Sequence, residues 1–191
     1  IGKVISGAAV KKKIGQGGMG SVYLGHHLTL DIPVAIKFLD PIFARQHPDA
    51  VERFLKEARA VAKLKHPHIV SVLNAGFEEG FYFISMEFVK GKNMEELLET
   101  PFPLPLGNAL LLIGQICGAL EFAHNNKIVH RDIKPANIFI DEEGNAKVGD
   151  LGLAKDLSEE QSMTHTSQYM GTPYYLSPEQ ATNAKGVDQR S

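Results

Sequence analysis

The sequence lacks the cysteine pairs that form disulfides and the N-terminal pattern of a signal peptide. Cys117 is its single cysteine, so neither an internal disulfide nor a thiolate metal cluster can form, and a reducing compartment is expected. We predict that this cysteine fills part of the core. The N-terminus, from Ile1 onward, lacks the basic flank and the long apolar run of a signal peptide. These absences favour a cytoplasmic location.

An excess of positive charge is also absent. The 20 Lys and Arg residues are outnumbered by 22 Asp and Glu residues, which gives a formal net charge of −2. A nucleic-acid-binding surface therefore has no support from composition, and we expect no nucleic-acid partner. The short basic run at residues 11–13 is expected to be a solvated strand edge.

A convincing membrane span is lacking as well. Residues 101–120 carry no charged side chain, and about 20 such residues would cross a bilayer. Prolines, glycines and polar side chains interrupt this run, which leaves an apolar helix of roughly four turns that suits a buried core. We expect no membrane span within this segment, and an anchor elsewhere in a longer protein stays open.

What the chain does have is enough apolar content to fold. With 43% hydrophobic residues among 191, it can form one sizeable domain or a small two-lobed one. No internal repeat or low-complexity tract is visible in it.

The first part of the chain shows mainly strand patterns. Five runs rich in β-branched and aromatic side chains predict strands, at residues 4–5, 21–24, 33–39, 69–75 and 81–89. Apolar residues at helical spacing predict one amphipathic helix over residues 49–64, which Pro67 closes. Gly80 suits a tight turn between the last two strands. This part is therefore predicted to be an antiparallel sheet around one helix.

Helical patterns dominate the second part. A short helix is predicted at residues 94–98, followed by the charge-poor helix, which runs to about His124. Asn125 and Asn126 offer a left-handed C-cap for that helix. Beyond it we predict a small hairpin with strands at residues 137–141 and 146–149, and then a polar loop at residues 155–168.

A glycine cluster at residues 15–20 is followed by Ser21 and Val22 and fits the pattern G-x-G-x-x-G-x-V. The same spacing occurs in dinucleotide-binding folds, but there a helix follows, whereas here a strand is predicted. Between strands, glycines let backbone amides approach phosphate oxygens closely. We therefore favour a phosphate-covering hairpin over a plain turn. A Walker A loop is excluded because no Gly-Lys-Ser/Thr follows.

A lysine and a glutamate follow at positions that fit this hairpin. Lys37 ends an apolar strand segment that matches V-A-I-K, and it can reach phosphates if an anion holds it. Glu57, at helical spacing from Phe54 and Val61, can be that anion. Each residue also has a simpler interpretation, because an isolated strand lysine is usually solvated and Glu57 can pair with basic neighbours on the helix surface.

The decisive segment is His-Arg-Asp-Ile-Lys-Pro-Ala-Asn at residues 130–137, followed after the hairpin by Asp-Leu-Gly at residues 150–152. Together with the glycine cluster and Lys37, it resembles the signature set of protein kinases. The whole chain resembles a eukaryotic-like (Hanks-type) Ser/Thr kinase domain of the bacterial type. The resemblance implies an α+β, two-lobed fold, with an N-lobe of antiparallel sheet plus one helix at residues 1–89. A mainly helical, incomplete C-lobe would occupy residues 90–191.

The resemblance also implies ATP and Mg²⁺ as cofactors and assigns roles to individual residues. Asp132 would take the proton of the substrate hydroxyl, while Lys134 would neutralise charge on the moving phosphoryl group. Asn137 and Asp150 would hold magnesium, and Lys37 with Glu57 would complete the catalytic set. The expected nucleotide-binding residues are Ile14, Gly15, Gly17, Gly18, Gly20, Val22, Ala35, Lys37, Met86, Glu87, Val89 and Phe139. The alternative for the buried polar residues is a hydrogen-bonded turn without catalysis.

Four apolar or aromatic residues look similar to the stack that links the two lobes in active kinases. They are Val61, Leu73, His130 and Leu151. In this interpretation His130 is structural, and neither it nor the pair His26 and His27 implies a metal site.

The resemblance also implies a specificity for Ser/Thr substrates and a control of activity by phosphorylation. Lys134, two residues after Asp132, follows the Ser/Thr pattern, and so does the segment 171–179, in which Thr172 would hydrogen-bond toward Asp132. Arg131 would bind a phosphate on the activation segment, for which Thr164 and Thr166 are the candidates. A solvated loop without a switch is the alternative. Protein substrates with Ser or Thr and a dimer that autophosphorylates are the expected partners.

The chain departs from the family pattern in three places. Leu151 replaces the usual Phe, Ser177 replaces the usual Ala, and the sequence stops where kinases continue into further helices. We therefore expect a fragment with exposed apolar surface and doubtful activity by itself. The alternative functions are a pseudokinase scaffold that binds ATP without transfer and a small-molecule phosphotransferase, which would lack the segment 171–179.

Overall fold

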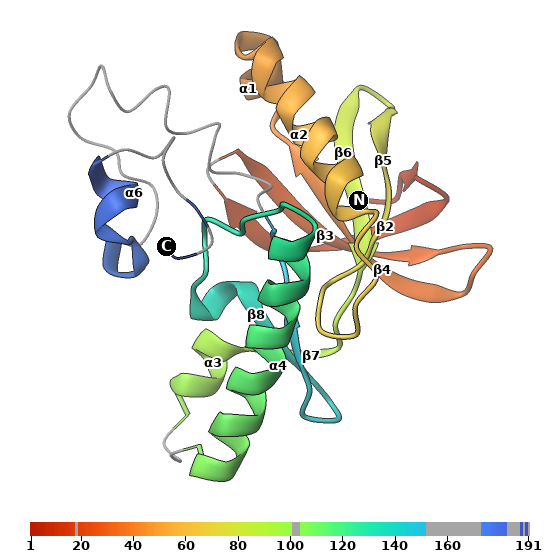
Figure 1. The fold of residues 1–191 in the computed structure, drawn as a ribbon. Coiled ribbons are helices and arrows are strands. Elements are labelled where there is room, and N and C mark those ends of the chain that lie inside the picture. The colour runs from red at the N-terminus through yellow and green to blue at the C-terminus, as the bar shows by residue number, and fades with distance from the viewer. Residues whose placement is uncertain (18, 101–103, 152–172, 183–187, 189, 191) are drawn as a thin grey trace. The chain divides into compact units, whose positions relative to one another are not determined.

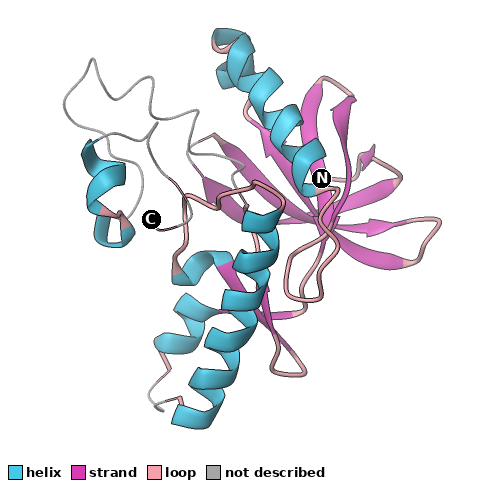
Figure 2. Ribbon diagram, viewed as in Figure 1, coloured by secondary structure: helices cyan, strands magenta, loops and turns pink. Residues whose placement is uncertain are grey.

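The computed structural model describes residues 1–17, 19–100, 104–151, 173–182, 188 and 190. The chain divides into two compact units, which are described separately below. The first comprises Ile1–Lys63 and Ser71–Phe88, and the second comprises Leu64–Val70 and Val89–Ser191. Figures 1 and 2 show the sheet-rich first unit and the second unit, whose most prominent element is a long helix.

The first unit is built on a six-stranded antiparallel sheet with the order β1-β2-β3-β4-β6-β5. Its strands are β1 (Val4–Ile5), β2 (Ala8–Gly17), β3 (Gly20–His27), β4 (Ile32–Leu39), β5 (Val72–Glu78) and β6 (Phe81–Glu87). Strand β2 was not among the predicted strands, because its middle carries exposed lysines where a strand pattern needs apolar residues. A buried cluster anchors the sheet and consists of Ile5, Ala8, Val10, Val34, Ile36 and Phe83.

The first unit contains two helices, α1 (Pro41–Gln46) and α2 (Pro48–Val61), so the expectation of one helix was wrong. Helix α1 begins with a standard signal, because Oδ1 of Asp40 accepts the N–H groups of Ile42 and Phe43 at 2.9 Å and proline follows at the first position. It is six residues long and buries no side chain, so it has no apolar periodicity to detect.

Helix α2 confirms the predicted amphipathic helix and contacts β5 and β6. It buries Ala50, Phe54, Ala58 and Val61. Their spacing of three or four residues places them on one face of the helix. The helix ends three residues earlier than predicted, at Val61.

The edge strand β5 begins at Val72, three residues later than predicted, and contains a β-bulge at Leu73. The bulge breaks the alternation of side chains, and Leu73 is 47% exposed. The expectation that Leu73 joins a buried stack was therefore wrong. The turn into β6 is confirmed, because Glu79 and Gly80 have φ values of 51° and 85°, as two-residue hairpin loops require.

The second unit contains a three-stranded antiparallel sheet of β7 (Gly91–Asn93), β8 (Ile138–Asp141) and β9 (Ala146–Val148). The same unit contains the helices α3 (Met94–Leu98), α4 (Leu106–Asn125) and α6 (Pro178–Thr182) and the 3₁₀ turns η1 (Pro135–Asn137) and η2 (Pro173–Tyr175). The predicted hairpin and the short helix α3 are confirmed, whereas β7 was not predicted. Residues Leu64–Val70 join this unit because Val70 N–H donates to the carbonyl of Val148 at 2.9 Å.

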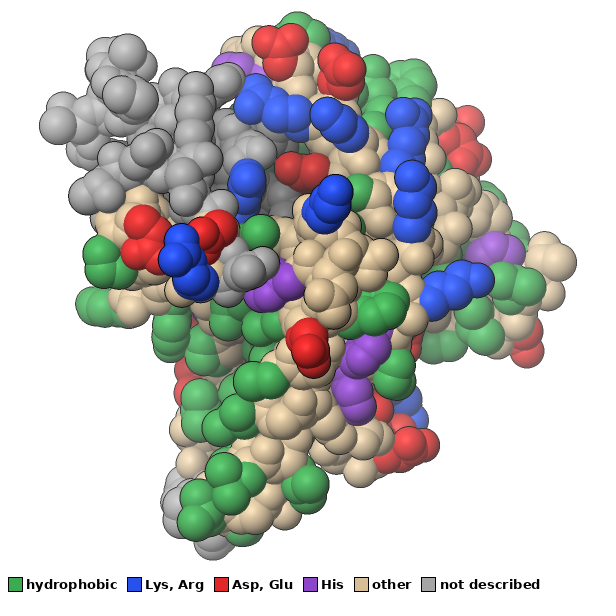
Figure 3. Space-filling view, viewed as in Figure 1, with side chains coloured by type: hydrophobic (Ala, Val, Ile, Leu, Met, Phe, Trp, Pro, Cys, Tyr) green, Lys and Arg blue, Asp and Glu red, His purple; other side chains and the backbone are tan. Residues whose placement is uncertain are grey.

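Helix α4 has the predicted type but not the predicted environment. It buries Leu112, Ala119 and Ala123, yet Leu111 is 68% exposed and Cys117 is exposed. The expectations of a core helix and a core cysteine were therefore wrong. Figure 3 shows hydrophobic side chains gathered over the part of the view where α4 lies in Figure 1.

Two further properties of α4 differ from the expectation or qualify it. The left-handed residue after the helix is Lys127, with φ of 60°, and not Asn125 or Asn126. By length and composition alone, α4 could cross a membrane, which is weak evidence for a span.

Candidate active site

Three polar side chains converge on the loop that precedes β8 in the second unit. Oδ2 of Asp132 lies 2.8 Å from Nζ of Lys134 and 3.0 Å from Nδ2 of Asn137. Nδ2 of Asn137 also donates to the backbone carbonyl of Asp132 at 2.7 Å. The turn η1 folds the chain back on itself, so residues five positions apart meet. The result is a half-buried carboxylate held between a cation and an amide.

The side-chain amide of Asn137 has a fixed orientation. Because Nδ2 donates twice to Asp132, the oxygen Oδ1 is the amide atom that can face a cation. The backbone of Asn137 is also held, since its N–H donates to Lys134 O and its carbonyl accepts from Gly149 N–H, both at 2.9 Å. Carboxamide oxygens are hard ligands of the kind that Mg²⁺ takes.

His130 connects this loop to the segment that carries Asp150. Its Nε2 donates to the carbonyl of Gly149 at 2.8 Å, and its Nδ1 accepts the N–H of Asp132 at 3.2 Å. Burial lowers the pKa of His130, which favours the neutral ring that this donor-acceptor pair requires. Asp150 itself has φ of 51°, a left-handed conformation that aspartate tolerates better than most residues. The hydrogen-bonded network therefore includes the predicted metal ligand Asn137 and extends to Gly149, which directly precedes the other predicted ligand, Asp150.

Phe139 and Gly149 are matched in size. A Cβ atom added to Gly149 would lie 2.6 Å from Cε2 of Phe139, which is far inside van der Waals contact. Phe139 is fixed in β8 by pairing with Asn93 of β7 and Lys147 of β9. Glycine at position 149 is thus needed for the observed position of the aromatic ring.

The predicted phosphate hairpin is formed by the end of β2 and the start of β3, where Gly15 pairs with Val22 and Gly17 with Gly20. A Cβ on Gly20 would lie 1.9 Å from the carbonyl oxygen of Phe38, so packing alone requires this glycine. A Cβ on Gly15 or Gly17 would meet nothing closer than 3.6 Å or 4.0 Å, and neither residue has a left-handed φ. Their lack of a side chain therefore fits the close approach of a ligand to the backbone.

The other predicted nucleotide residues of the first unit lie on neighbouring strands. Lys37 of β4 pairs with Val22 of β3 and with Ile84 of β6. Two residues along the same strands, Ala35 pairs with Met86. Two of the predicted residues are partly peripheral, because Ile14 is 42% exposed in the irregular part of β2 and Glu87 ends β6.

Glu57 lies on α2 beside the buried Phe54 and Ala58. Its oxygen Oε2 is buried, which does not fit a freely solvated surface glutamate. The position instead suits an anion that faces the interior of the first unit.

Several predicted residues are not part of this picture. Gly18, Gly152, Thr164, Thr166 and Thr172 lie outside the described residues, and Val89 begins the second part of the second unit. Arg131 is described and has φ of 64°. Sequence reasoning missed Gln180, whose Nε2 donates to the backbone carbonyl of Arg131 at 2.7 Å. The signal for this residue was the spacing Ser-x-x-Gln at residues 177–180.

The two predicted metal ligands supply oxygen atoms only. Among residues outside the gaps in the structure, no group of three or more His, Cys, Asp and Glu side chains could hold a metal ion. Asn137 and Asp150 provide two oxygen donors, and Mg²⁺ commonly takes a few protein ligands together with substrate phosphates and water. The residues present therefore fit magnesium bound with a nucleotide better than a closed protein site.

Comparison with known proteins agrees with this geometry. The family described as protein kinase domain matches residues 8–190. Serine/threonine-protein kinase PrkC of Bacillus subtilis is 46% identical over 182 residues, which are 95% of this chain and 28% of PrkC. Serine/threonine-protein kinase PknB of Mycobacterium leprae is 40% identical over 182 residues, which are 93% of this chain and 29% of PknB. The chain thus spans less than a third of these curated relatives.

Solved structures give the same fold. The PknI kinase domain of M. tuberculosis aligns with a TM-score of 0.69 and 31% identity, covering 83% of this chain and 66% of that one. A structure titled PpkA-294 apo form aligns with a TM-score of 0.82 over 95% of this chain and 70% of its own, and at 24% identity it supports the fold alone. The predicted α+β kinase fold is confirmed. The chain belongs to the protein kinase domain family and is similar to its bacterial Ser/Thr members.

Proposed function

We propose that the protein containing this chain is a Ser/Thr protein kinase that transfers the γ-phosphate of ATP to protein hydroxyls. The observation that carries the proposal is the Asp132 carboxylate, held 2.8 Å from Lys134 Nζ and 3.0 Å from Asn137 Nδ2. A carboxylate in this setting can accept a hydroxyl proton while the lysine neutralises the phosphoryl group. Similarity to named Ser/Thr kinases favours this reaction over other phosphoryl transfers.

The residues proposed to bind the nucleotide are those that the resemblance to kinases assigns in each unit. Gly15, Gly17 and the undescribed Gly18 would bring backbone amides to the phosphates, with Lys37 as their cation and Glu57 as its partner. Adenine would contact the apolar residues Val22, Ala35, Met86 and Phe139, with Ile14 at the edge, and the backbone of Glu87 and Val89 would hydrogen-bond it. When bound, Mg²⁺ supplies charge neutralisation at the phosphate oxygens, and Asn137 and Asp150 would hold it.

The experiment that tests this function is label transfer from [γ-³²P]ATP to a generic protein substrate, with the longer protein that contains residues 1–191. Acid hydrolysis of the product should give phosphoserine and phosphothreonine. Label found mainly as phosphotyrosine would contradict the Ser/Thr assignment.

Regulation by the activation segment is part of the proposal. Phosphate on Thr164 or Thr166 would form charge-assisted hydrogen bonds with Arg131, and Thr172 would contact the catalytic loop. A transient dimer on the cytoplasmic side would allow one copy to modify the other. After incubation with MgATP, mass spectrometry should find phosphate on Thr164 or Thr166, and an active enzyme with both threonines unmodified would contradict this regulation.

Nucleotide affinity should depend on the match between Gly149 and Phe139. In the variant Gly149→Ala, the new Cβ would displace the Phe139 ring from its observed position, 2.6 Å away. Because Phe139 is proposed to support the adenine, we expect KM for ATP to rise about tenfold, equivalent to about 1.4 kcal/mol. Steady-state kinetics at varied ATP measures this.

The matched control for this prediction is the double variant Gly149→Ala with Phe139→Leu. The smaller leucine makes room for the added Cβ, so KM for ATP should return most of the way to the wild-type value. A double variant no better than Gly149→Ala would show that the two positions do not act through steric contact.

A further inference from the structure

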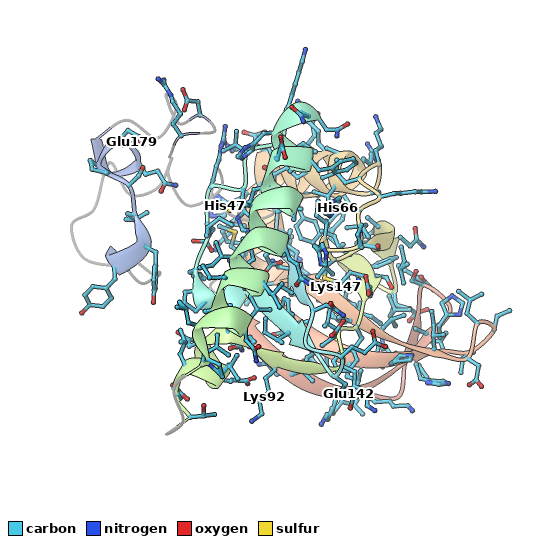
Figure 4. All side chains as sticks on the ribbon, turned by 60° about the horizontal axis from the view of Figure 1, so that its bottom comes forward. His47, His66, Lys92, Glu142, Lys147 and Glu179 are labelled. Atoms are coloured by element: carbon cyan, nitrogen blue, oxygen red, sulfur yellow. The ribbon has the colours of Figure 1, made fainter. Side chains whose placement is uncertain are left out.

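The departure at Ser177 has a structural counterpart in α6. Oγ of Ser177 accepts the N–H of Gln180 at 3.3 Å, and Oε1 of Gln180 accepts the N–H of Ser177 at 3.1 Å. This reciprocal pair is a capping box, and proline at the first helical position completes the start of the helix. Alanine, the usual residue at position 177 in kinases, could not form it. Figure 4 labels Glu179, which lies on the same helix.

The other end of the Gln180 amide reaches the catalytic loop. Nε2 of Gln180 donates to the backbone carbonyl of Arg131 at 2.7 Å. The two backbone partners fix the amide orientation, because Ser177 N–H can only donate and Arg131 C=O can only accept. The position needs one acceptor and one donor on a single planar group. Glutamine meets this requirement, whereas glutamate would face the Arg131 carbonyl with a second acceptor.

The carbonyl that Gln180 binds belongs to the peptide group directly before Asp132. The N–H of that same peptide, which is the N–H of Asp132, donates to Nδ1 of His130 at 3.2 Å. Because a peptide group is planar, bonds at its two ends fix its tilt and hence the Cα of Asp132. Arg131 adopts φ of 64°, which is unfavourable for a residue with a Cβ, so this conformation needs such support from its surroundings.

We propose that Gln180 is a positioning residue for phosphoryl transfer. It holds the Arg131 carbonyl, and thereby keeps the Asp132 carboxylate in the orientation that accepts the proton of the substrate hydroxyl. The inference rests on the proposed kinase function. It links the segment that contains η2 and α6 to the general base through one side chain. Among the described residues, Gln180 bonds to Ser177 and Arg131 and to none of the groups assigned to the nucleotide. Its loss should therefore affect the rate of transfer and not the affinity for ATP.

The test compares three variants of the longer protein in the same transfer assay. Gln180→Glu keeps the acceptor for Ser177 N–H but loses the donor to Arg131, and we expect kcat to fall about 10- to 100-fold, as for a base displaced by a fraction of an ångström to 1 Å. KM for ATP should stay within about twofold, since the nucleotide contacts are unchanged. Gln180→Met, which has no carboxylate to repel the carbonyl, should show the same loss of kcat.

The matched control is Ser177→Ala. It removes the other half of the capping box but leaves the bond from Gln180 to Arg131, so kcat should stay within about twofold of wild type even if the helix is less stable, because a cap is worth only about 1 kcal/mol.

The possible results distinguish a failure of the kinase proposal from a failure of the proposed role of Gln180. An inactive wild-type protein would refute the kinase proposal itself. An active wild type with unchanged kcat in Gln180→Glu and Gln180→Met would overturn the role of Gln180. A fall in kcat that Ser177→Ala reproduces, or that comes with an equal loss of ATP affinity and of thermal midpoint, would show a purely structural role and would also overturn it.

Discussion

Replacing Asp132 by asparagine in the longer protein is expected to lower kcat by a factor of about 10²–10⁴, the contribution typical of a positioned general base. Asparagine keeps the shape of the side chain, so the loop and the nucleotide contacts should persist. It cannot take up the hydroxyl proton at neutral pH. Initial rates of label transfer at saturating ATP measure kcat, and calorimetric titration with ATP should give an affinity within about twofold of wild type.

The matched control for this change is Asp141→Asn. Oδ1 of Asp141 accepts the N–H groups of Glu143 and Asn145 at 3.0 and 2.8 Å in the turn after β8, and asparagine retains an oxygen for both bonds. The same change of charge at this turn should leave kcat nearly unchanged. An Asp132→Asn enzyme as active as the Asp141→Asn control would remove the general base from the account.

Replacing Asp150 by asparagine should cost about 10²-fold or more in kcat, because a charged oxygen ligand to magnesium contributes several kcal/mol of charge stabilisation in the transition state. The backbone should be unaffected, since asparagine tolerates the left-handed φ of 51° as well as aspartate does. Activity measured over a range of Mg²⁺ concentrations should show weaker binding of the metal, as a higher half-saturating Mg²⁺ concentration.

Asp31 provides the control with the same backbone conformation. It has φ of 55°, and its side chain is 91% exposed and bonded to Nε2 of His26. Asp31→Asn therefore repeats the chemical change at a left-handed position of the first unit, outside the predicted site residues. Equal Mg²⁺ dependence in wild type and Asp150→Asn would show that Asp150 does not hold the metal.

The catalytic loop was the part of the site most open to prediction from the sequence. Asp132, Lys134 and Asn137 lie within six consecutive residues, and a single turn at η1 brings them together. Their contacts are local, so the order of residues nearly determines them. The hairpin turn at Glu79 and Gly80 was predictable for the same reason, since glycine marks the left-handed position directly.

Features that depend on distant partners were not predictable. The exposure of Leu73 follows from a bulge against β6, which no local pattern signals. The apolar sequence of α4 indicates a buried helix, but Leu111 and Cys117 are exposed because few of the described elements pack on that helix. Gln180 has a local signal for a helix cap, but its bond to Arg131 spans 49 residues and appears only in the folded chain.

The central claim is that the network around Asp132 transfers phosphate and does not merely bind the nucleotide. The most direct measurement is a single-turnover reaction of the longer protein with stoichiometric Mg-[γ-³²P]ATP, in which bound nucleotide and protein-linked phosphate are followed together. The account predicts that bound ATP is converted to ADP as label appears on serine or threonine. Stable binding of ATP with no transfer of label would contradict it and would identify a nucleotide-binding scaffold.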